Sequence, residues 1–143
     1  MINRFAAVFF SALLFSGCEE QLGPEAFAHV GAYDLEEVNG EPLPWVAEVG
    51  GGRTEEVTQG TITLHADNTF THEIHWILIT NEGSNPTSEI RGGRYRIFRD
   101  QLSFEEDNVG ENRPATYSGA VDEDRLVIAS PNFFAVYRRA SDE

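Results

Sequence analysis

The segment NTFTHEIHW, residues 68–76, places two histidines and a glutamate within a few positions of each other. These residue types bind zinc and perform acid–base catalysis. Zinc peptidases carry their two histidines four positions apart on a helix, whereas His72 and His75 are three apart. If the segment is a strand, side chains three positions apart point to opposite faces, so the two histidines cannot share an ion. The spacing therefore predicts no metal site here.

The loop that precedes this segment decides which way His72 points. In a three-residue loop at 66–68, Asn68 adopts the left-handed conformation that asparagine tolerates, and Leu64 pairs with Phe70. This register sorts apolar and polar side chains onto separate faces of the sheet, whereas a two-residue loop mixes them. The sorted register predicts an inward stripe made of Ile62, Leu64, Phe70, His72, Ile74 and Trp76.

His72 is the one polar side chain in that stripe. A buried imidazole without a hydrogen-bond partner would cost about 1–3 kcal/mol, so we expect it to have one. Two interpretations stay open. His72 is either a core histidine bonded to a neighbour such as Tyr95 or Tyr117, or a residue that contacts a ligand inside a cavity.

Eight short runs of alternating, β-branched or aromatic residues occur between residues 30 and 139, separated by turn residues at close spacing. No long amphipathic helical pattern interrupts them. Sequential hairpins in this number predict an all-β fold, an eight-stranded up-and-down antiparallel barrel, with a β-sandwich as the alternative. Residues 140–143 would form a short tail. The expected strands are 31–38, 58–65, 69–79, 89–98, 101–105, 115–121, 125–129 and 133–139.

The N-terminus carries an export signal, residues 1–17, in which Arg4 precedes an apolar run. The run is shorter than the roughly 20 residues that a membrane-spanning helix needs. FSGC, residues 15–18, resembles a bacterial lipobox, and Cys18 is the only cysteine of the chain. We therefore expect signal cleavage and lipid attachment, such as palmitate, at Cys18, followed by a tether.

The tether, residues 18–29, contains Gly, Pro and acidic residues without a sustained periodicity. Glu19 follows the cysteine where an inner-membrane retention signal would usually have Asp. By resemblance to Gram-negative lipoproteins, this implies a lipid-anchored protein of the cell envelope that is sorted to the outer membrane.

The 143-residue chain has a formal charge of −14 and contains no lysine. Loss of residues 1–17, whose only charged residue is Arg4, would leave a charge of −15. Such a surface repels phosphate backbones and anionic headgroups, so we expect no nucleic-acid partner. The mature chain has no nucleophile motif and no phosphate-binding loop, and we expect neither enzymatic activity nor a cofactor.

Four arginines crowd one predicted strand, at positions 91, 94, 96 and 99. An anion site is one interpretation. Because carboxylates are abundant, we favour cross-strand ion pairs on the outer face.

Four segments carry a family pattern: GAYDLEEVNGEPLP, GTITLHADNTF, GGRYRIFRDQLSF and FFAVYRRA. Together they resemble the bacterial lipocalin-like domains, small calycin-type barrels often found in lipoproteins. The resemblance implies that Tyr33, where lipocalins have tryptophan, packs against Arg138 or Arg139 to close the barrel. It also implies that the first connection covers the mouth, where a helical turn starting at Pro44 would carry Trp45. A similar opening strand occurs in the small all-β domain of heat-inducible envelope lipoproteins.

Two functional hypotheses follow. In the first, a small apolar or amphipathic molecule binds inside the barrel, where apolar walls supply affinity and a polar group fixes orientation. In the second, the barrel is filled and the protein is a structural or interaction module that contacts an envelope partner through an outer patch such as Ile77 and Ile79. The expected ligand-binding residues in the first case are Trp45, Phe70, His72, Ile74, Trp76 and Tyr95.

Overall fold

The computed structural model describes residues 28–107, 115–131 and 133–141. The signal, Cys18 and most of the tether lie outside these ranges. All regular elements within them are strands. The strands are β1 (Gly31–Val38), β2 (Glu41–Pro42), β3 (Trp45–Gly50), β4 (Arg53–Leu64), β5 (Thr69–Thr80), β6 (Gly83–Phe98), β7 (Gln101–Glu106), β8 (Thr116–Asp122), β9 (Arg125–Ser130) and β10 (Phe133–Arg139).

Eight of these strands close into an antiparallel barrel. From β4 to β10, each strand pairs with its neighbour in the sequence. β1 pairs with both β10 and β4 and so closes the ring. This sequential pairing is the up-and-down arrangement, which confirms the predicted fold and shows that the sandwich alternative is wrong.

The hairpin between β4 and β5 has the predicted register. Leu64 pairs with Phe70 and Ile62 pairs with His72. Asn68 has a φ of 64°, the left-handed conformation that the three-residue loop requires. The hydrophobic sorting of the two strands therefore identified the inward side chains correctly.

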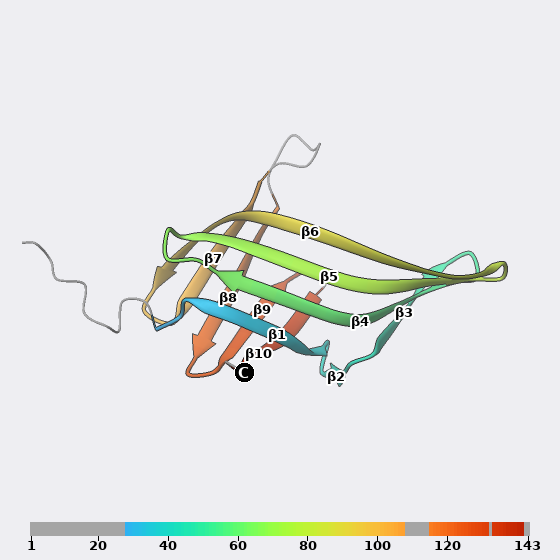
Figure 1. Ribbon diagram of the computed structural model, residues 1–143, viewed down its shortest axis with the longest axis horizontal. Coiled ribbons are helices and arrows are strands. Elements are labelled where there is room, and N and C mark those ends of the chain that lie inside the picture. Colours follow the sequence, from blue (N-terminus) through green and yellow to red (C-terminus); the bar gives the residue numbers. More distant parts are fainter. Residues whose placement is uncertain (1–27, 108–114, 132, 142–143) are drawn as a thin grey trace, which may run out of the picture.

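Three barrel strands extend into an arm, which we define as β3 together with residues 53–57, 76–80 and 83–87. Figure 1 shows β4, β5 and β6 running well past the ends of β7–β10. β3 pairs with the first residues of β4 along this extension. The predicted strands began at residues 58 and 89, whereas β4 and β6 begin at Arg53 and Gly83, so both predicted strands were too short.

The predicted helical turn after Pro44 is wrong, because the segment forms β3. Trp45 pairs with Val57 in an antiparallel ladder. The turn to β4 uses residues 50–52, three glycines with φ values of 79°, 63° and 72°. Glycine adopts these positive φ values without steric cost, so the three glycines form the turn of the β3–β4 hairpin and do not cap a helix.

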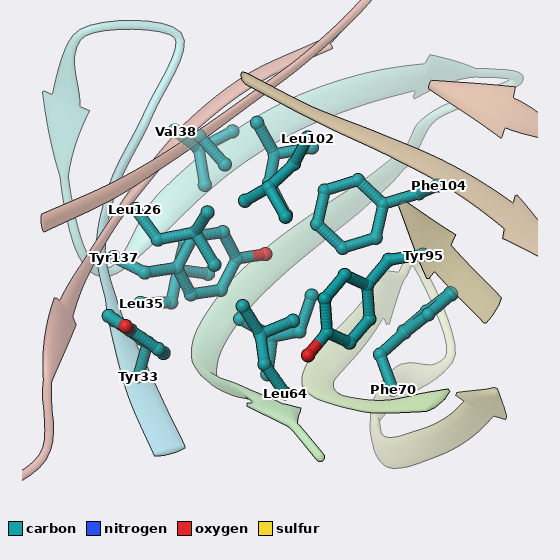
Figure 2. Close-up of a cluster of buried hydrophobic side chains, with 13 residues drawn as sticks. Tyr33, Leu35, Val38, Leu64, Phe70, Tyr95, Leu102, Phe104, Leu126 and Tyr137 are labelled. Atoms are coloured by element: carbon teal, nitrogen blue, oxygen red, sulfur yellow. The ribbon is translucent and has the colours of Figure 1, made fainter. Parts of the chain in front are cut away.

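Side chains fill the end of the barrel where the chain enters at residue 28. Figure 2 shows Tyr95, Phe104 and Phe70 close together beside Leu64. The Phe70 and Phe104 rings meet edge to face with centroids 5.2 Å apart. Tyr33, Leu64 and Phe104 are fully buried. This end of the barrel is a packed core, which leaves the arm end as the place for a cavity.

Candidate functional site

A cavity of about 430 Å³ lies at the arm end of the barrel. Apolar or aromatic side chains of its wall come from β4, β5, β8, β9 and β10, and charged side chains come from β4, β6 and β7. The lining residues are Glu55, Val57, His72, Ile74, Trp76, Glu89, Arg91, Glu106, Ala115, Thr116, Tyr117, Ile128, Ser130 and Phe133.

His72 lies in the wall of this cavity and is only 8% exposed. Its Nε2 lies 2.9 Å from the hydroxyl oxygen of Tyr137, and the two rings meet at 72°. Burial, with a smaller contribution from the neighbouring Arg91, lowers the pKa of His72 to about 4. The imidazole is therefore neutral at pH 7. It shares a hydrogen bond with the Tyr137 hydroxyl, as donor or acceptor according to its tautomer.

The expected partners of His72, Tyr95 and Tyr117, are both wrong. Tyr95 donates a hydrogen bond to the His65 carbonyl at 2.7 Å and contacts His29 at 3.0 Å, near the filled end. Tyr137 lies on β10, which is far from β5 in sequence but on the opposite wall of the barrel. His72 therefore bonds across the barrel to β10 and not to β6 or β8, the strands that carry Tyr95 and Tyr117.

The neutral state of His72 predicts a loss of stability in acid. The unfolded chain protonates this histidine near its ordinary pKa of about 6.5, whereas the folded chain resists protonation until about pH 4. Between these values the unfolded state binds more protons, so stability falls as the pH falls. From pH 7 to pH 5, the free energy of unfolding should drop by about 2 kcal/mol more in the wild type than in His72→Gln.

Urea titrations at the two pH values measure this difference. His75→Gln is the control, because His75 lies on the outer face, where it contacts Glu73 at 3.0 Å with 41% of its side chain exposed. This control should follow the wild type. Equal acid losses in wild type and His72→Gln would show that His72 is not held neutral.

Arg91 faces the cavity mouth, contrary to the expectation of outer-face ion pairs. Arg91 on β6 lies directly opposite His72 on β5 in the antiparallel ladder, so both side chains point to the same side of the sheet. Its Nε and Nη2 bind the two oxygens of Glu89 at 2.8 and 2.9 Å. Its Nη1 lies 3.7 Å from Oε2 of Glu106. Arg94 and Arg96 do lie on the outer face, exposed, and form none of the ion pairs found among the described residues.

Tyr117 also lines the cavity, and its ring stacks on Phe104 with centroids 5.0 Å apart. Its buried hydroxyl has no hydrogen-bond partner among the described residues. Burial raises the pKa of Tyr117, and the nearby Glu106 carboxylate raises it further. The hydroxyl is thus protonated, and the Glu106 carboxylate is the acceptor that lies close to it.

The predicted ligand-binding residues divide among three places. Ile74 and Trp76 line the cavity together with His72. Phe70 is 2% exposed and belongs to the packed core below the cavity. Tyr95 belongs to the same packed core, at the filled end. Trp45 packs beside Val57 at the edge of the core, outside the ring of lining residues.

Tyr33 and Arg139 meet at the filled end of the barrel. The Arg139 guanidinium lies over the Tyr33 ring, 4.9 Å from its centroid, and Nη2 donates to the tyrosine hydroxyl at 2.6 Å. Nη1 donates to the Val30 carbonyl at 2.9 Å. Arg138 points outward instead, where it binds Glu36 and Asp124. Of the two arginines named from the resemblance, Arg139 is therefore the one in contact with Tyr33.

Comparison of the chain with protein-family models and with curated proteins finds no match. Within the part of the chain that the structure describes, no helix is long and apolar enough to cross a membrane. No group of three or more His, Cys, Asp or Glu side chains in the same part could hold a metal ion. The architecture is compatible with a lipocalin-like fold, and the site must be interpreted from its own geometry.

Four polar side chains of the cavity wall were not predicted as site residues from the sequence: Glu89, Arg91, Glu106 and Tyr117. The signal was present as alternation. Glu89 and Arg91 lie at even spacings from the inward Tyr95 on β6, so they point to the same side of the sheet. Glu106 lies two positions from the inward Phe104 on β7 and also points inward. Charged side chains at inward positions near a strand end mark the mouth of a barrel.

Proposed function

We propose that this protein is a lipid-anchored, lipocalin-like protein of the bacterial cell envelope that binds a small amphipathic molecule in the open end of its barrel. The cavity carries the proposal, since apolar walls with a few polar groups are the usual composition of a small-molecule site. Its volume of about 430 Å³ lies within the range of such sites. The up-and-down closed barrel and the contact between Tyr33 and Arg139 support the relation to lipocalin-like domains.

The position of residue 28, the first described residue, gives the proposed binder an orientation. Residue 28 lies at the filled end, where the Arg139 side chain binds its carbonyl oxygen. A lipid on Cys18 would hold that end within about 33 Å of the membrane, the reach of roughly ten extended residues. The mouth of the cavity, at the arm end, would then open away from the membrane. The ligand would arrive from the aqueous side of the envelope.

Titration with a neutral apolar fluorophore tests the binding function. The whole chain is used in phosphatidylcholine nanodiscs, with protein-free nanodiscs as the blank. We expect saturable binding that Trp76→Ala weakens by about tenfold, because the variant removes a large apolar contact from the wall. His72→Leu should also change the affinity, because it removes the polar group nearest the core.

Phe98→Ala is the matched control, since Phe98 is an aromatic residue that is 74% exposed and lies outside the cavity. It should bind the fluorophore as the wild type does. Absence of saturable binding to the wild type, or wild-type affinity in folded Trp76→Ala and His72→Leu, would contradict the binding function.

Metabolic labelling with palmitate tests the anchoring separately. Wild type should incorporate label and Cys18→Ser should not, because Cys18 supplies the only thiol of the chain. Equal labelling of both proteins would contradict lipid attachment at Cys18 and the orientation derived from it.

The alternative function is an interaction module of the envelope, and the arm is the observation that favours it. Val46, Val49 and Ile79 are exposed apolar residues on the arm, at 52%, 39% and 37%. Native mass spectrometry of the protein purified from its own envelope separates the two functions. Co-purified small-molecule mass supports the binder, whereas a bare chain or a chain with a bound protein supports the module.

A further inference from the structure

Negatively charged side chains outnumber positively charged ones around the cavity. Three carboxylates line it, those of Glu55, Glu89 and Glu106, against the guanidinium of Arg91. His72 adds no charge at neutral pH, because burial lowers its pKa to about 4. Among the described residues, the lining therefore carries a net negative charge of two.

Arg91 does not balance these carboxylates evenly. Its guanidinium is committed to Glu89, which it binds through two nitrogens at 2.8 and 2.9 Å. Glu106 lies 3.7 Å from the remaining nitrogen, beyond hydrogen-bond distance, and only 13% of its side chain is exposed. A carboxylate so largely removed from water favours a positive group beside it. Among the described residues the only ion pair of Glu106 is this longer contact with Arg91, so its carboxylate has room for a second cation.

Two further groups near Glu106 suit the same occupant. The Tyr117 hydroxyl lies close to this carboxylate and has no partner among the described residues. An ammonium group has several N–H donors and can bind a carboxylate and a hydroxyl oxygen together. Trp76 lines the same cavity and offers an aromatic face, which attracts cations.

From this arrangement we infer that the cavity selects a cationic amphipath, an ammonium group on an apolar chain, over an anionic one such as a fatty acid. The ammonium binds Glu106 and the chain lies against the apolar wall formed by Val57, Ile74 and Phe133. A carboxylate headgroup at the same place would meet like charges. This inference rests on the proposed binding function and specifies the class of ligand.

Three ligands with the same eight-carbon chain separate the headgroup from the chain. Octylammonium, octanol and octanoate are titrated by calorimetry into the whole chain in phosphatidylcholine nanodiscs at low salt. We expect octylammonium to bind at least about tenfold more tightly than octanoate, with octanol between them. The preference should shrink as salt is added.

Isosteric variants locate the preference. Glu106→Gln should lower octylammonium affinity by about five- to tenfold and leave octanol affinity unchanged. Glu89→Gln releases the Arg91 guanidinium and should raise octanoate affinity. Glu105→Gln is the matched control, because Glu105 is the exposed neighbour on the outer face of the same strand, and it should bind all three ligands as the wild type does. Circular dichroism confirms that each variant is folded.

The outcomes distinguish the inference from the function on which it rests. Equal or tighter binding of octanoate, or unchanged octylammonium affinity in folded Glu106→Gln, overturns the headgroup inference and leaves the binding function standing. If none of the three ligands binds, both are overturned.

Discussion

Gly93→Ala is expected to destabilise the protein by at least about 4 kcal/mol, because a Cβ atom at this position would collide with backbone. The added carbon would lie 2.1 Å from the Glu105 carbonyl oxygen and 2.8 Å from the Glu106 Cα. A flexible side chain could move aside at small cost, but these atoms belong to the paired strand β7. The two strands would have to separate and lose ladder hydrogen bonds.

Urea unfolding followed by circular dichroism measures the effect, with Gly92→Ala as the matched control. A Cβ atom at Gly92 would lie 3.2 Å from the Phe70 carbonyl oxygen, a tight contact that a shift of a few tenths of an ångström relieves. Gly92→Ala should therefore fold and lose much less stability. Similar stabilities for the two alanine variants would show that β6 and β7 adjust freely at Gly93.

The same substitution reports on the cavity. Gly93 lies between Arg91 and Tyr95 on the inward side of β6 and pairs with Glu106. Separation of the strands there would displace Glu106 and Arg91 from each other. Any Gly93→Ala protein that folds should consequently bind the fluorophore more weakly than Gly92→Ala does.

The sequence predicted the barrel and its hairpin register because both depend on strict alternation. A one-residue slip at Asn68 would have placed Leu64 on the opposite face of the sheet from Phe70 and Trp76, so hydrophobic sorting left one choice. From β4 to β10 the strands pair in the order of the sequence, and such pairing needs no long-range information. Local patterns were therefore sufficient for this part of the fold.

The arm could not be predicted in the same way, because its residues bury little. Glu55, Glu56 and Asn85 are poor strand formers by composition, and Pro86 usually argues against a strand. In the structure, β6 pairs with β7 only from Gly93 onward, so Pro86 lies on an unpaired edge where it displaces no ladder hydrogen bond from that side. Pairing with β5, continued from the barrel, extends the strand past the region that the apolar pattern marks.

The polar part of the site escaped prediction because it depends on contacts across the barrel. Alternation assigns His72 to the interior but does not say which strand lies opposite, and Tyr137 is 65 positions away in the sequence. Arg91 was assigned to the outer face because charged residues are usually exposed. The open end of a barrel is the exception, since inward side chains there reach both the cavity and water.

Arg139→Ala should destabilise the protein by about 2–4 kcal/mol, the second large effect that we expect. Its guanidinium makes charged hydrogen bonds to the Tyr33 hydroxyl and the Val30 carbonyl, each worth about 1.5–3 kcal/mol, and a cation–π contact worth about 0.5–1 kcal/mol. These contributions overlap, because one side chain makes all three contacts, so their sum overstates the loss. Removal of the guanidinium would also leave the Val30 carbonyl without this partner.

The neighbouring residue provides the control, because Arg138 and Arg139 differ mainly in the face of the sheet that they occupy. Arg138 binds Glu36 and Asp124 on the outside, where solvent and salt screen its ion pairs, so Arg138→Ala should have a much smaller effect. Arg139→Lys keeps the charge but loses the planar fork that binds several oxygens at once, and it should recover only part of the stability. Urea unfolding of the three variants measures how much free energy of unfolding each one loses. Equal losses in Arg138→Ala and Arg139→Ala would mean that the contact of Arg139 with Tyr33 does not stabilise the filled end.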